Sequence, residues 1–291
     1  MNIRRPEFVI WSPRYSDGSG GVILLHLLCA RLNELGYSAA MWPDIKPTSW
    51  KSVRSALSWM VKGLPAWNAA TPFNNPIANR TALADAVAFY PETISGNPLR
   101  APKVARWLLH RPAFHVGRAE YGSDDLLVFH EHAFNTPGLP DTHRLSLTYV
   151  NPVYRDRHEA RRGSAYLVRK GQGREMVHPP GAIPLDGLSH EETANVLNRV
   201  EHVYSYDPYT MYNHYAAISG AVPIIIPPAG MTSEAWLPDP NERAGIAWGP
   251  DDIDRAVATR PALMKRFADR RIVEDEMVHR FVQMARSKDA W

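Results

Sequence analysis

The sequence predicts an α/β fold made of two Rossmann-like domains that face each other across a cleft. Short apolar runs, typical of buried strands, alternate with helical segments in both halves of the chain. This alternation stops at a polar, basic stretch over residues 151–163 and restarts beyond it. The chain has 291 residues, of which 45% are hydrophobic and 22% charged, and this is enough to bury two cores of ordinary size.

The first half opens as strand, glycine turn, helix and strand. Residues 7–11 (EFVIW) form an apolar run that predicts a buried strand, and a glycine-rich turn follows at 16–21. The next segment predicts a helix over 22–35 that ends at Gly36, and residues 37–42 predict the second strand. This order is typical of the βαβ unit of a parallel sheet.

The rest of the first half continues the alternation. The pattern predicts short helices within 49–62, a helix over 101–109, and strands at 84–90, 125–129 and 146–150.

The second half repeats the same rhythm. Ser189 and Glu192 have the spacing of a capping box at a helix start. The predicted strands are 165–168, 202–206 and 222–226, and the predicted helices are 189–199, 208–219 and 274–286.

Cysteine content and charge exclude several classes of protein. Cys29 is the single cysteine, so the chain has no internal disulfide and no multi-cysteine metal site. Lys and Arg number 33 against 30 Asp and Glu, and this excess is too small for a nucleic-acid binder. Seven cations do fall within residues 155–174, where a solvated linker and an anion site are equally good interpretations.

No apolar run approaches the roughly 20 residues that span a bilayer, and no export signal is recognisable. We therefore expect a cytoplasmic protein, at most in peripheral contact with the inner face of a membrane.

The glycine loop after the first strand is the first candidate site. Gly18, Ser19, Gly20 and Gly21 lie between a predicted strand and a predicted helix, so backbone N–H groups can approach an anion or a sugar there. The spacing is neither that of a dinucleotide fingerprint nor that of a P-loop. A tight turn with only a packing role is the alternative.

Two cations end a predicted strand of the second half. Arg169 and Lys170 precede Gly171, a combination that suits a diphosphate because a bidentate guanidinium and a point charge can share its oxygens. A solvated basic loop is the alternative.

A helix start is predicted shortly after the strand at 202–206. Asp207 fits the N-cap, Pro208 the first helical position and Thr210 the third. Such a start offers free N–H groups and the Thr210 hydroxyl to a phosphate, while Asp207 caps the helix or binds a ribose hydroxyl.

These motifs resemble a known family. The runs SYDPYT, AAISG, VPIIIP, SEAW and GIAWGPDDIDRAVAT are similar to the second domain of nucleotide-sugar glycosyltransferases of the GT-B fold. The runs SGGVILLHLLCARLNELGY and FYPETISGNPL resemble the first domain, and VRKG resembles a basic motif at a strand end. The bacterial group from lipopolysaccharide-core and surface-polysaccharide gene clusters is the most similar one.

The resemblance implies a division of labour. It implies an acceptor-side domain over 1–155, a donor-side domain over 156–272, and a terminal helix over 273–291 that packs on the first domain. It also implies a nucleoside-diphosphate sugar as donor and a cell-surface glycan or glycolipid as acceptor. We expect no cofactor and no metal, because cationic side chains can replace a divalent ion and no Asp-x-Asp pair lies next to the basic strand end or the helix start described above. The residues that the resemblance places near the donor are Arg169, Lys170, Asp207, Tyr209, Thr210 and Glu234.

Four side chains are candidates for the catalytic base. Glu92, His130 and Glu131 each come directly after a predicted strand, and Asp17 lies beside the glycine loop. Loop residues with satisfied hydrogen bonds, or an Asx turn for Asp17, are the alternatives.

Both stereochemical outcomes of the transfer stay open. The retaining pattern of two glutamates seven residues apart is replaced by Asp207 and His214.

Two other functions use the same kind of fold. One is a non-catalytic glycan-binding or scaffold protein. The other is a dinucleotide-dependent sugar oxidoreductase or epimerase, which requires a glycine fingerprint that the loop lacks.

Overall fold

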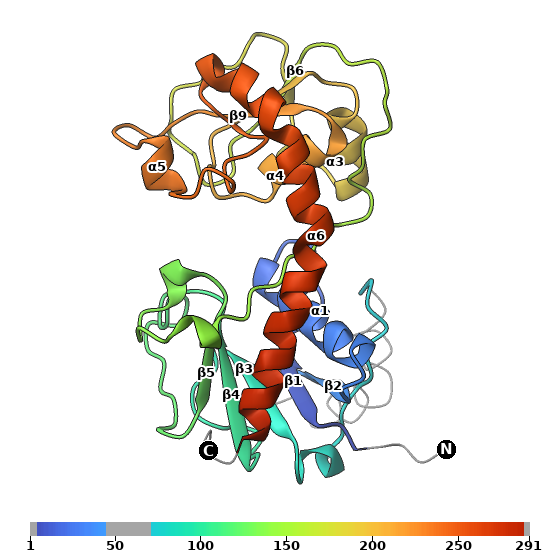
Figure 1. The fold of residues 1–291 in the computed structure, drawn as a ribbon, viewed down its shortest axis with the longest axis vertical. Helices are drawn as coiled ribbons and strands as arrows, with labels where there is room; N and C mark the ends of the chain where they lie inside the picture. The colour runs from blue at the N-terminus through green and yellow to red at the C-terminus, as the bar shows by residue number, and fades with distance from the viewer. Residues whose placement is uncertain (1–4, 45–70, 288–291) are drawn as a thin grey trace, which may run out of the picture. The chain divides into compact units, whose positions relative to one another are not determined.

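The computed structural model describes residues 5–44 and 71–287, which divide into two units (Figure 1). Unit 1 comprises Met1–Tyr149 and Arg271–Trp291, and unit 2 comprises Val150–Arg270. The short helices predicted within 49–62 lie outside the described residues.

Unit 1 is built on a parallel five-stranded sheet with the order β2-β1-β3-β4-β5. Its strands are β1 (Phe8–Ser12), β2 (Ala39–Pro43), β3 (Val87–Pro91), β4 (Lys103–Leu108) and β5 (Leu126–Phe129). Its helices are α1 (Gly20–Glu34), the short 3-10 turns η2 (Arg80–Leu83), η3 (His132–Phe134) and η4 (Asp141–His143), and the last part of α6 (Ile253–Arg286).

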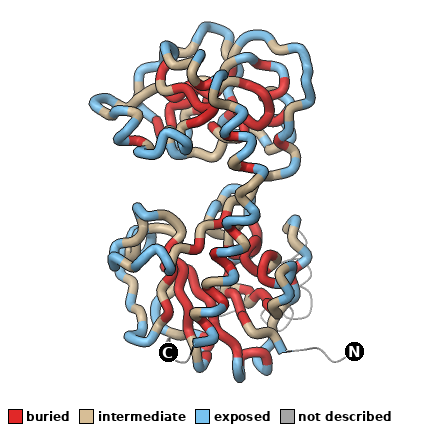
Figure 2. Tube along the Cα trace, viewed as in Figure 1, coloured by how far each residue is buried: buried red, intermediate tan, exposed pale blue. Residues whose placement is uncertain are grey.

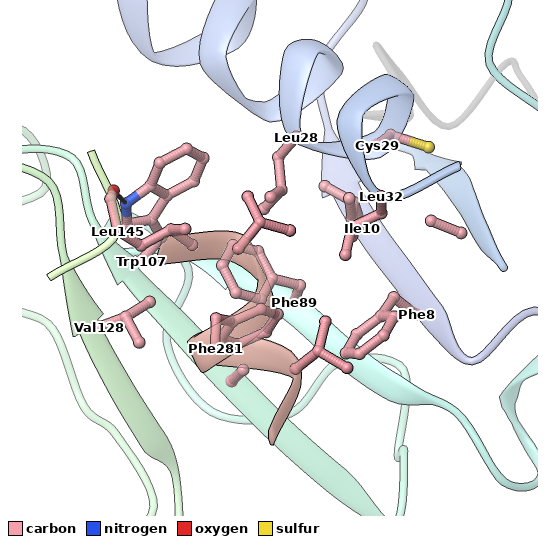
Figure 3. Close-up of a cluster of buried hydrophobic side chains, with 14 of the residues drawn as sticks. Phe8, Ile10, Leu28, Cys29, Leu32, Phe89, Trp107, Val128, Leu145 and Phe281 are labelled. Carbon is pink, nitrogen blue, oxygen red and sulfur yellow. Dashed lines mark hydrogen bonds between the residues drawn. The ribbon is translucent and has the colours of Figure 1, made fainter. Parts of the chain in front are cut away.

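Both faces of this sheet are buried, which explains why its strands are apolar runs rather than alternating patterns. Phe8, Phe89 and Trp107 point to one face, where α1 and the end of α6 cover them (Figure 3). Neighbouring strand residues such as Val9 and Tyr90 point to the other face.

The end of α6 is part of the unit 1 core. The Phe281 ring contacts Phe89 at a centroid distance of 5.1 Å and Phe8 at 5.5 Å. Glu274, also on α6, is buried with Arg31 of α1, and 3.4 Å separate a carboxylate oxygen from the guanidinium. The apolar side of the end of α6 therefore packs against the sheet of unit 1.

Unit 2 contains a second parallel sheet with the order β10-β9-β8-β6-β7. Its strands are β6 (Ser164–Leu167), β7 (Ile183–Pro184), β8 (His202–Ser205), β9 (Val222–Ile225) and β10 (Ala247–Trp248). Its helical elements are α3 (His190–Leu197), α4 (Tyr212–Ser219), α5 (Ser233–Trp236), η5 (Pro250–Asp252) and the first part of α6.

The core of unit 2 lies between the sheet and the helices α3, α4 and α6. The predicted capping box is confirmed, since Ser189 accepts a hydrogen bond from the Glu192 N–H and Glu192 accepts one from the Ser189 N–H. The polar stretch 151–163 belongs to this unit. Its Arg161 is only 17% exposed and donates to the carbonyls of Leu197 and Ser219, so this cation does not lie in a solvated linker.

The predicted helix over 101–109 is wrong, because these residues contain the interior strand β4, which pairs with β3 and β5. Arg106 lies in the middle of β4 and is fully buried. Its guanidinium pairs with Asp125 and donates to the carbonyls of Ile94 and Gly96. In the sequence, a charged residue among apolar ones indicates the polar face of an amphipathic helix. Only the distant partners of Arg106 explain how it can lie inside a sheet.

Two further predictions of secondary structure differ from the structure. Residues 146–150 form no strand, and the Thr148 N–H donates instead to the Glu274 carboxylate at 2.8 Å. The helix predicted to start at Glu274 starts at Ile253, so α6 runs for 34 residues.

Burial follows the two sheets (Figure 2). Within the described ranges, no helix combines the length and the apolar character that crossing a membrane requires.

Candidate functional site

All the loops that carry candidate residues follow the carboxyl ends of strands. In a parallel sheet these ends share one edge, where ligands bind in open α/β folds. In unit 1 the glycine loop follows β1, Glu92 follows β3, and His130 with Glu131 follows β5. In unit 2 Arg169 and Asp207 follow β6 and β8. The predicted placement of these loops at the two edges is confirmed.

The glycine loop leaves open space at its edge. Helix α1 begins at Gly20, and the Ser19 side chain makes no capping hydrogen bond. A Cβ atom built on Gly20 meets no atom within 4 Å, whereas one on Gly21 comes within 3.6 Å of the Leu109 side chain. The loop therefore lies beside the loop that follows β4. Asp17, which is exposed, accepts a hydrogen bond of 2.7 Å from the Tyr15 hydroxyl.

Glu92 is a buried carboxyl group at the same edge. It is only 4% exposed, and its Oε2 accepts a hydrogen bond of 3.2 Å from the Leu109 N–H. Burial raises the pKa of Glu92, and the hydrogen bond from Leu109 and the nearby His115 oppose that rise in part. A raised pKa makes this carboxylate a stronger base than an exposed glutamate.

The segment after β3 is held by side chains that the sequence analysis missed. The Tyr121 hydroxyl donates to the Glu92 carbonyl at 2.8 Å, and burial raises the pKa of Tyr121 to about 12. The Arg106 guanidinium lies over the Tyr121 ring at 4.6 Å and donates to the Ile94 and Gly96 carbonyls. Together these contacts fix the backbone of Glu92 and of the residues that follow it.

His130 and Glu131 form a second titratable pair at the end of β5. Their side chains are 3.6 Å apart, and the imidazole packs edge-on against Trp107 at 6.0 Å. Burial lowers the pKa of His130, so its neutral, proton-accepting form is favoured. Glu131 is about half exposed and also pairs with Arg144 at 3.6 Å. Glu92 is therefore the most deeply buried carboxylate of the four candidate bases.

Arg169 and Lys170 are both exposed at the end of β6. The backbone of Arg169 has a φ of +46°, a left-handed conformation, and its N–H donates to Asp186 at 3.2 Å. Its guanidinium lies 4.9 Å from the Tyr212 ring. The loop is thus fixed by its backbone, while its two cations face solvent.

The next part of this loop is packed tightly against β8. A Cβ atom on Gly171 would lie 2.3 Å from the Tyr206 carbonyl oxygen, so a glycine is required there. Arg174 donates to the carbonyls of Tyr206, Ile226 and Pro227 at 2.6–2.7 Å. In the sequence Arg174 resembles the other basic residues of its segment, and only its partners show that it ties the loop after β6 to the ends of β8 and β9.

The predicted capping roles of Asp207, Pro208 and Thr210 are wrong. Helix α4 begins at Tyr212, with Met211 in the N-cap position. The Asp207 carboxylate is buried and accepts from the Tyr209 N–H at 3.1 Å, and the Thr210 hydroxyl accepts from the Tyr212 N–H at 3.4 Å.

The later helix start has a physical cause. The Asn213 side chain donates to the Asp207 and Pro208 carbonyls, and the Trp236 indole also donates to the Pro208 carbonyl. These bonds shape residues 207–211 into a turn.

Tyr209 and Glu234 are two further exposed candidates of unit 2. The Tyr209 side chain has no packing partner that buries it and is 64% exposed. Glu234 accepts a hydrogen bond of 2.7 Å from the Ser233 hydroxyl and pairs with Arg243. These two partners lower the pKa of Glu234 to about 2, so it stays ionised at neutral pH.

His214, seven residues after Asp207, points away from this edge. Its ring packs against Phe267 of α6, with 5.4 Å between the centroids, and lies 3.5 Å from the Arg266 guanidinium. Burial, with Arg266 adding to it, lowers the pKa of His214 to about 4. It therefore does not take the place of a second edge carboxylate.

Within residues 5–44 and 71–287, no group of three or more histidine, cysteine or acidic side chains could hold a metal ion.

Comparison with known proteins gives coarse structural likenesses, among them the following two. No family model and no curated protein matches the chain. One similar structure is an alpha-glucosyltransferase in complex with UDP and a DNA that contains an HMU base. It has 12% identity and a TM-score of 0.41, with 94% of this chain and 93% of that one covered.

The other is the spinosyn forosaminyltransferase SpnP, with 13% identity, a TM-score of 0.38, and 97% and 96% of the two chains covered. Both are glycosyltransferases by name. TM-scores this low assign no function to this chain.

Proposed function

We propose that this chain is a glycosyltransferase of the GT-B type that moves a sugar from a nucleoside-diphosphate donor to a bacterial cell-surface glycan. The observation that carries the proposal is the different chemistry of two similar sheet edges. Unit 1 buries the basic carboxylate of Glu92, and unit 2 exposes Arg169 and Lys170. The sequence motifs of both halves, which resemble this family, support the same assignment. The two-domain cleft of that fold is part of the proposal.

The donor is assigned to unit 2. When the bond between the sugar and the diphosphate breaks, negative charge grows on the leaving phosphate oxygen, and fixed cations stabilise that charge. In this proposal Arg169 and Lys170 supply those cations, and the Thr210 hydroxyl is a further hydrogen-bond donor. The other residues assigned to the donor are Tyr209, Asp207 and Glu234. Because Glu234 is ionised, its carboxylate can accept hydrogen bonds from the hydroxyl groups of the sugar. Protein cations then take the place of a metal.

The acceptor is assigned to unit 1, beside the glycine loop. Glu92 is the general base: it takes the proton of the acceptor hydroxyl as that oxygen forms its bond to the anomeric carbon. Asp17 and the His130–Glu131 pair are the alternative bases. A base that activates a direct attack predicts inversion at the anomeric carbon. Proton NMR of the fresh product would show the opposite anomer to that of the donor.

A thermal-shift panel tests this function. UDP, GDP, ADP, CMP and NAD are added separately to the full chain and to Arg169→Ala. A nucleoside diphosphate at 100 times its Kd should stabilise the chain by about 2.7 kcal/mol through mass action. The shift should be reduced in the variant. Stabilisation by NAD alone would favour an oxidoreductase, and no response to any nucleotide would favour a glycan-binding scaffold.

A further inference from the structure

A set of stacked rings lies in the loop after β4, outside the groups used so far. The His110 ring contacts Phe134 of η3 at 4.9 Å and Phe114 at 4.3 Å, with interplanar angles of 26° and 38°. His115 packs against Phe114 at 5.0 Å. Phe114 is nevertheless 66% exposed, the largest exposure of any phenylalanine in the described ranges.

Phe114 is exposed without being loosely attached. Its N–H donates to the Arg111 carbonyl at 3.2 Å, and the Gly117 N–H donates to the Ala113 carbonyl at 2.7 Å. Ala113 has a φ of +66°, a left-handed conformation that side chains disfavour and that the turn enforces. A ring fixed in this way offers a preorganised flat surface, which lowers the entropic cost of binding a ring-shaped ligand.

A cationic group borders this surface. Arg111 is exposed, and its Nε donates to the Ala133 carbonyl at 3.3 Å, which aligns the guanidinium beside the stacked rings. Among the described residues, no carboxylate lies within ion-pair distance of Arg111, whereas Arg118 of the same loop pairs with Glu120. The charge of Arg111 is therefore available to an anionic ligand.

The stacked rings belong to the edge that carries Glu92. His110 directly follows Leu109, whose N–H donates to the Glu92 carboxylate, and His115 lies close enough to lower the pKa of Glu92. A ligand seated on Phe114 thus lies at the same edge as the general base.

We propose that Phe114, His110 and Arg111 form an acceptor subsite for an acidic saccharide. The C–H face of the sugar ring stacks on Phe114, and its carboxylate or phosphate binds the Arg111 guanidinium. This inference rests on the proposed function for the role of Glu92, but the binding site itself stands on the geometry of the loop.

A lipid surface fits the loop less well. A loop that inserts into a bilayer directs several apolar side chains outward. Here the Phe114 ring packs against His110 and His115 of its own loop, and Val116 is the one other apolar residue of the tip that is strongly exposed. The residues around it, Arg111 and His115, are polar.

The test uses the full chain, three variants and three probes. The probes are methyl glucuronide, glucose 6-phosphate and the neutral methyl glucoside, and binding is followed by saturation-transfer NMR. The variants are Phe114→Ala, Arg111→Gln and the matched control Val116→Ala, which removes an exposed apolar side chain of the same loop. UDP binding and thermal unfolding are measured for each, because both report on folding independently of this subsite.

An acidic probe should bind the parent chain more tightly than methyl glucoside. Preference for the carboxylate or for the phosphate would identify the anionic group. Phe114→Ala and Arg111→Gln should each weaken binding about tenfold, as expected when one stacking or charge-assisted contact is lost. Val116→Ala and the UDP affinities should be unchanged.

Two results would overturn the subsite: equal saccharide binding by all the variants, or UDP binding without saccharide binding. The second leaves the proposed function intact. Saccharide binding that depends on Phe114, without binding of any nucleotide, would support the subsite and contradict the proposed function. Phe114-dependent binding to phosphatidylglycerol vesicles, with no saccharide binding, would replace the saccharide by a membrane.

Discussion

The carboxyl edges of the two sheets differ in whether their charged candidate side chains are buried or exposed. Both sheets have five parallel strands, and in both the candidate residues follow strand ends. At the edge of unit 1, Glu92 is 4% exposed and its pKa is raised by burial. At the edge of unit 2, Arg169 and Lys170 are exposed, while the buried side of the loop is filled by Gly171 and Arg174.

This difference separates two kinds of chemistry. A carboxylate out of contact with water gains basicity, because burial disfavours its charged form. A guanidinium or ammonium group in solvent keeps its charge and attracts anions from a distance. Under the proposed function, proton transfer takes place at the edge of unit 1 and phosphate binding at the edge of unit 2.

Removing the base should have the largest effect. Glu92→Gln keeps the shape and the hydrogen bond from Leu109 but cannot accept the proton, so kcat should fall by about 10²–10⁴-fold. Nucleotide affinity, measured by calorimetry, should not change. An unchanged kcat would exclude Glu92, and Asp17→Asn and Glu131→Gln would then be tested in the same assay.

The pH dependence gives a second test of the same edge. The base must be ionised to act, and the pKa of Glu92 is raised above its ordinary value. The rate should therefore fall as pH is lowered through this raised pKa, at a higher pH than for an exposed glutamate. A pH profile of kcat should show this acid limb in the parent chain, and its persistence in Glu92→Gln would assign it to another group.

Substitutions at two glycines test how tightly the two edges are packed. Gly171→Ala places a Cβ against the Tyr206 carbonyl and should lower the free energy of unfolding by about 1–3 kcal/mol. Gly20→Ala adds a Cβ in open space at the start of α1 and should change it by less than about 1 kcal/mol, in the stabilising direction. Thermal unfolding checks both, and equal effects would contradict the packing described for Gly171.

Substitutions of the donor-side residues of unit 2 should have smaller effects, and these should appear in nucleotide affinity. Arg169→Ala and Thr210→Val should each weaken nucleoside-diphosphate binding by about 1–3 kcal/mol, as hydrogen bonds that involve charge do. Lys265→Ala, which removes an exposed cation on α6, is the matched control and should leave affinity unchanged. Calorimetric titration that shows equal affinity for all of them would place the donor elsewhere.

Chelation should have the smallest effect. If Arg169 and Lys170 stabilise the leaving group, EDTA should leave turnover nearly unchanged. A radiolabelled-donor assay with and without EDTA measures this. Loss of activity that Mg²⁺ or Mn²⁺ restores would show that a metal takes part.

Several elements were predictable because their signals are local. The strand, glycine loop and helix at the start of the chain need only an apolar run, flexible residues and a stop at Gly36. The capping box of α3 is also local, since Ser189 and Glu192 satisfy each other's backbone. The placement of Glu92 and Arg169 at sheet edges followed from the parallel topology that these signals imply.

Other features depend on contacts between distant residues. Residues 103–108 can form a strand because Asp125 pairs with the buried Arg106 and two carbonyls accept its other hydrogen bonds. The sequence does not show which acidic residue pairs with Arg106. Helix α4 starts late because Trp236 and Asn213 bind the preceding carbonyls. Local capping preference is worth about 1 kcal/mol, so a few such bonds outweigh it.

The sequence by itself determined the α/β class, the order of most strands and helices, and the loops at which chemistry is expected. These follow from periodicity and turn residues, which act over a few positions along the chain. Tertiary structure alone decided which of the candidate charges is buried and which is exposed: Glu92 is buried against the loop after β4, and Arg169 is exposed to solvent. The physical reason is that desolvation depends on everything packed around a group, and Leu109 and Tyr121, which contact Glu92, lie 17 and 29 positions further along the chain.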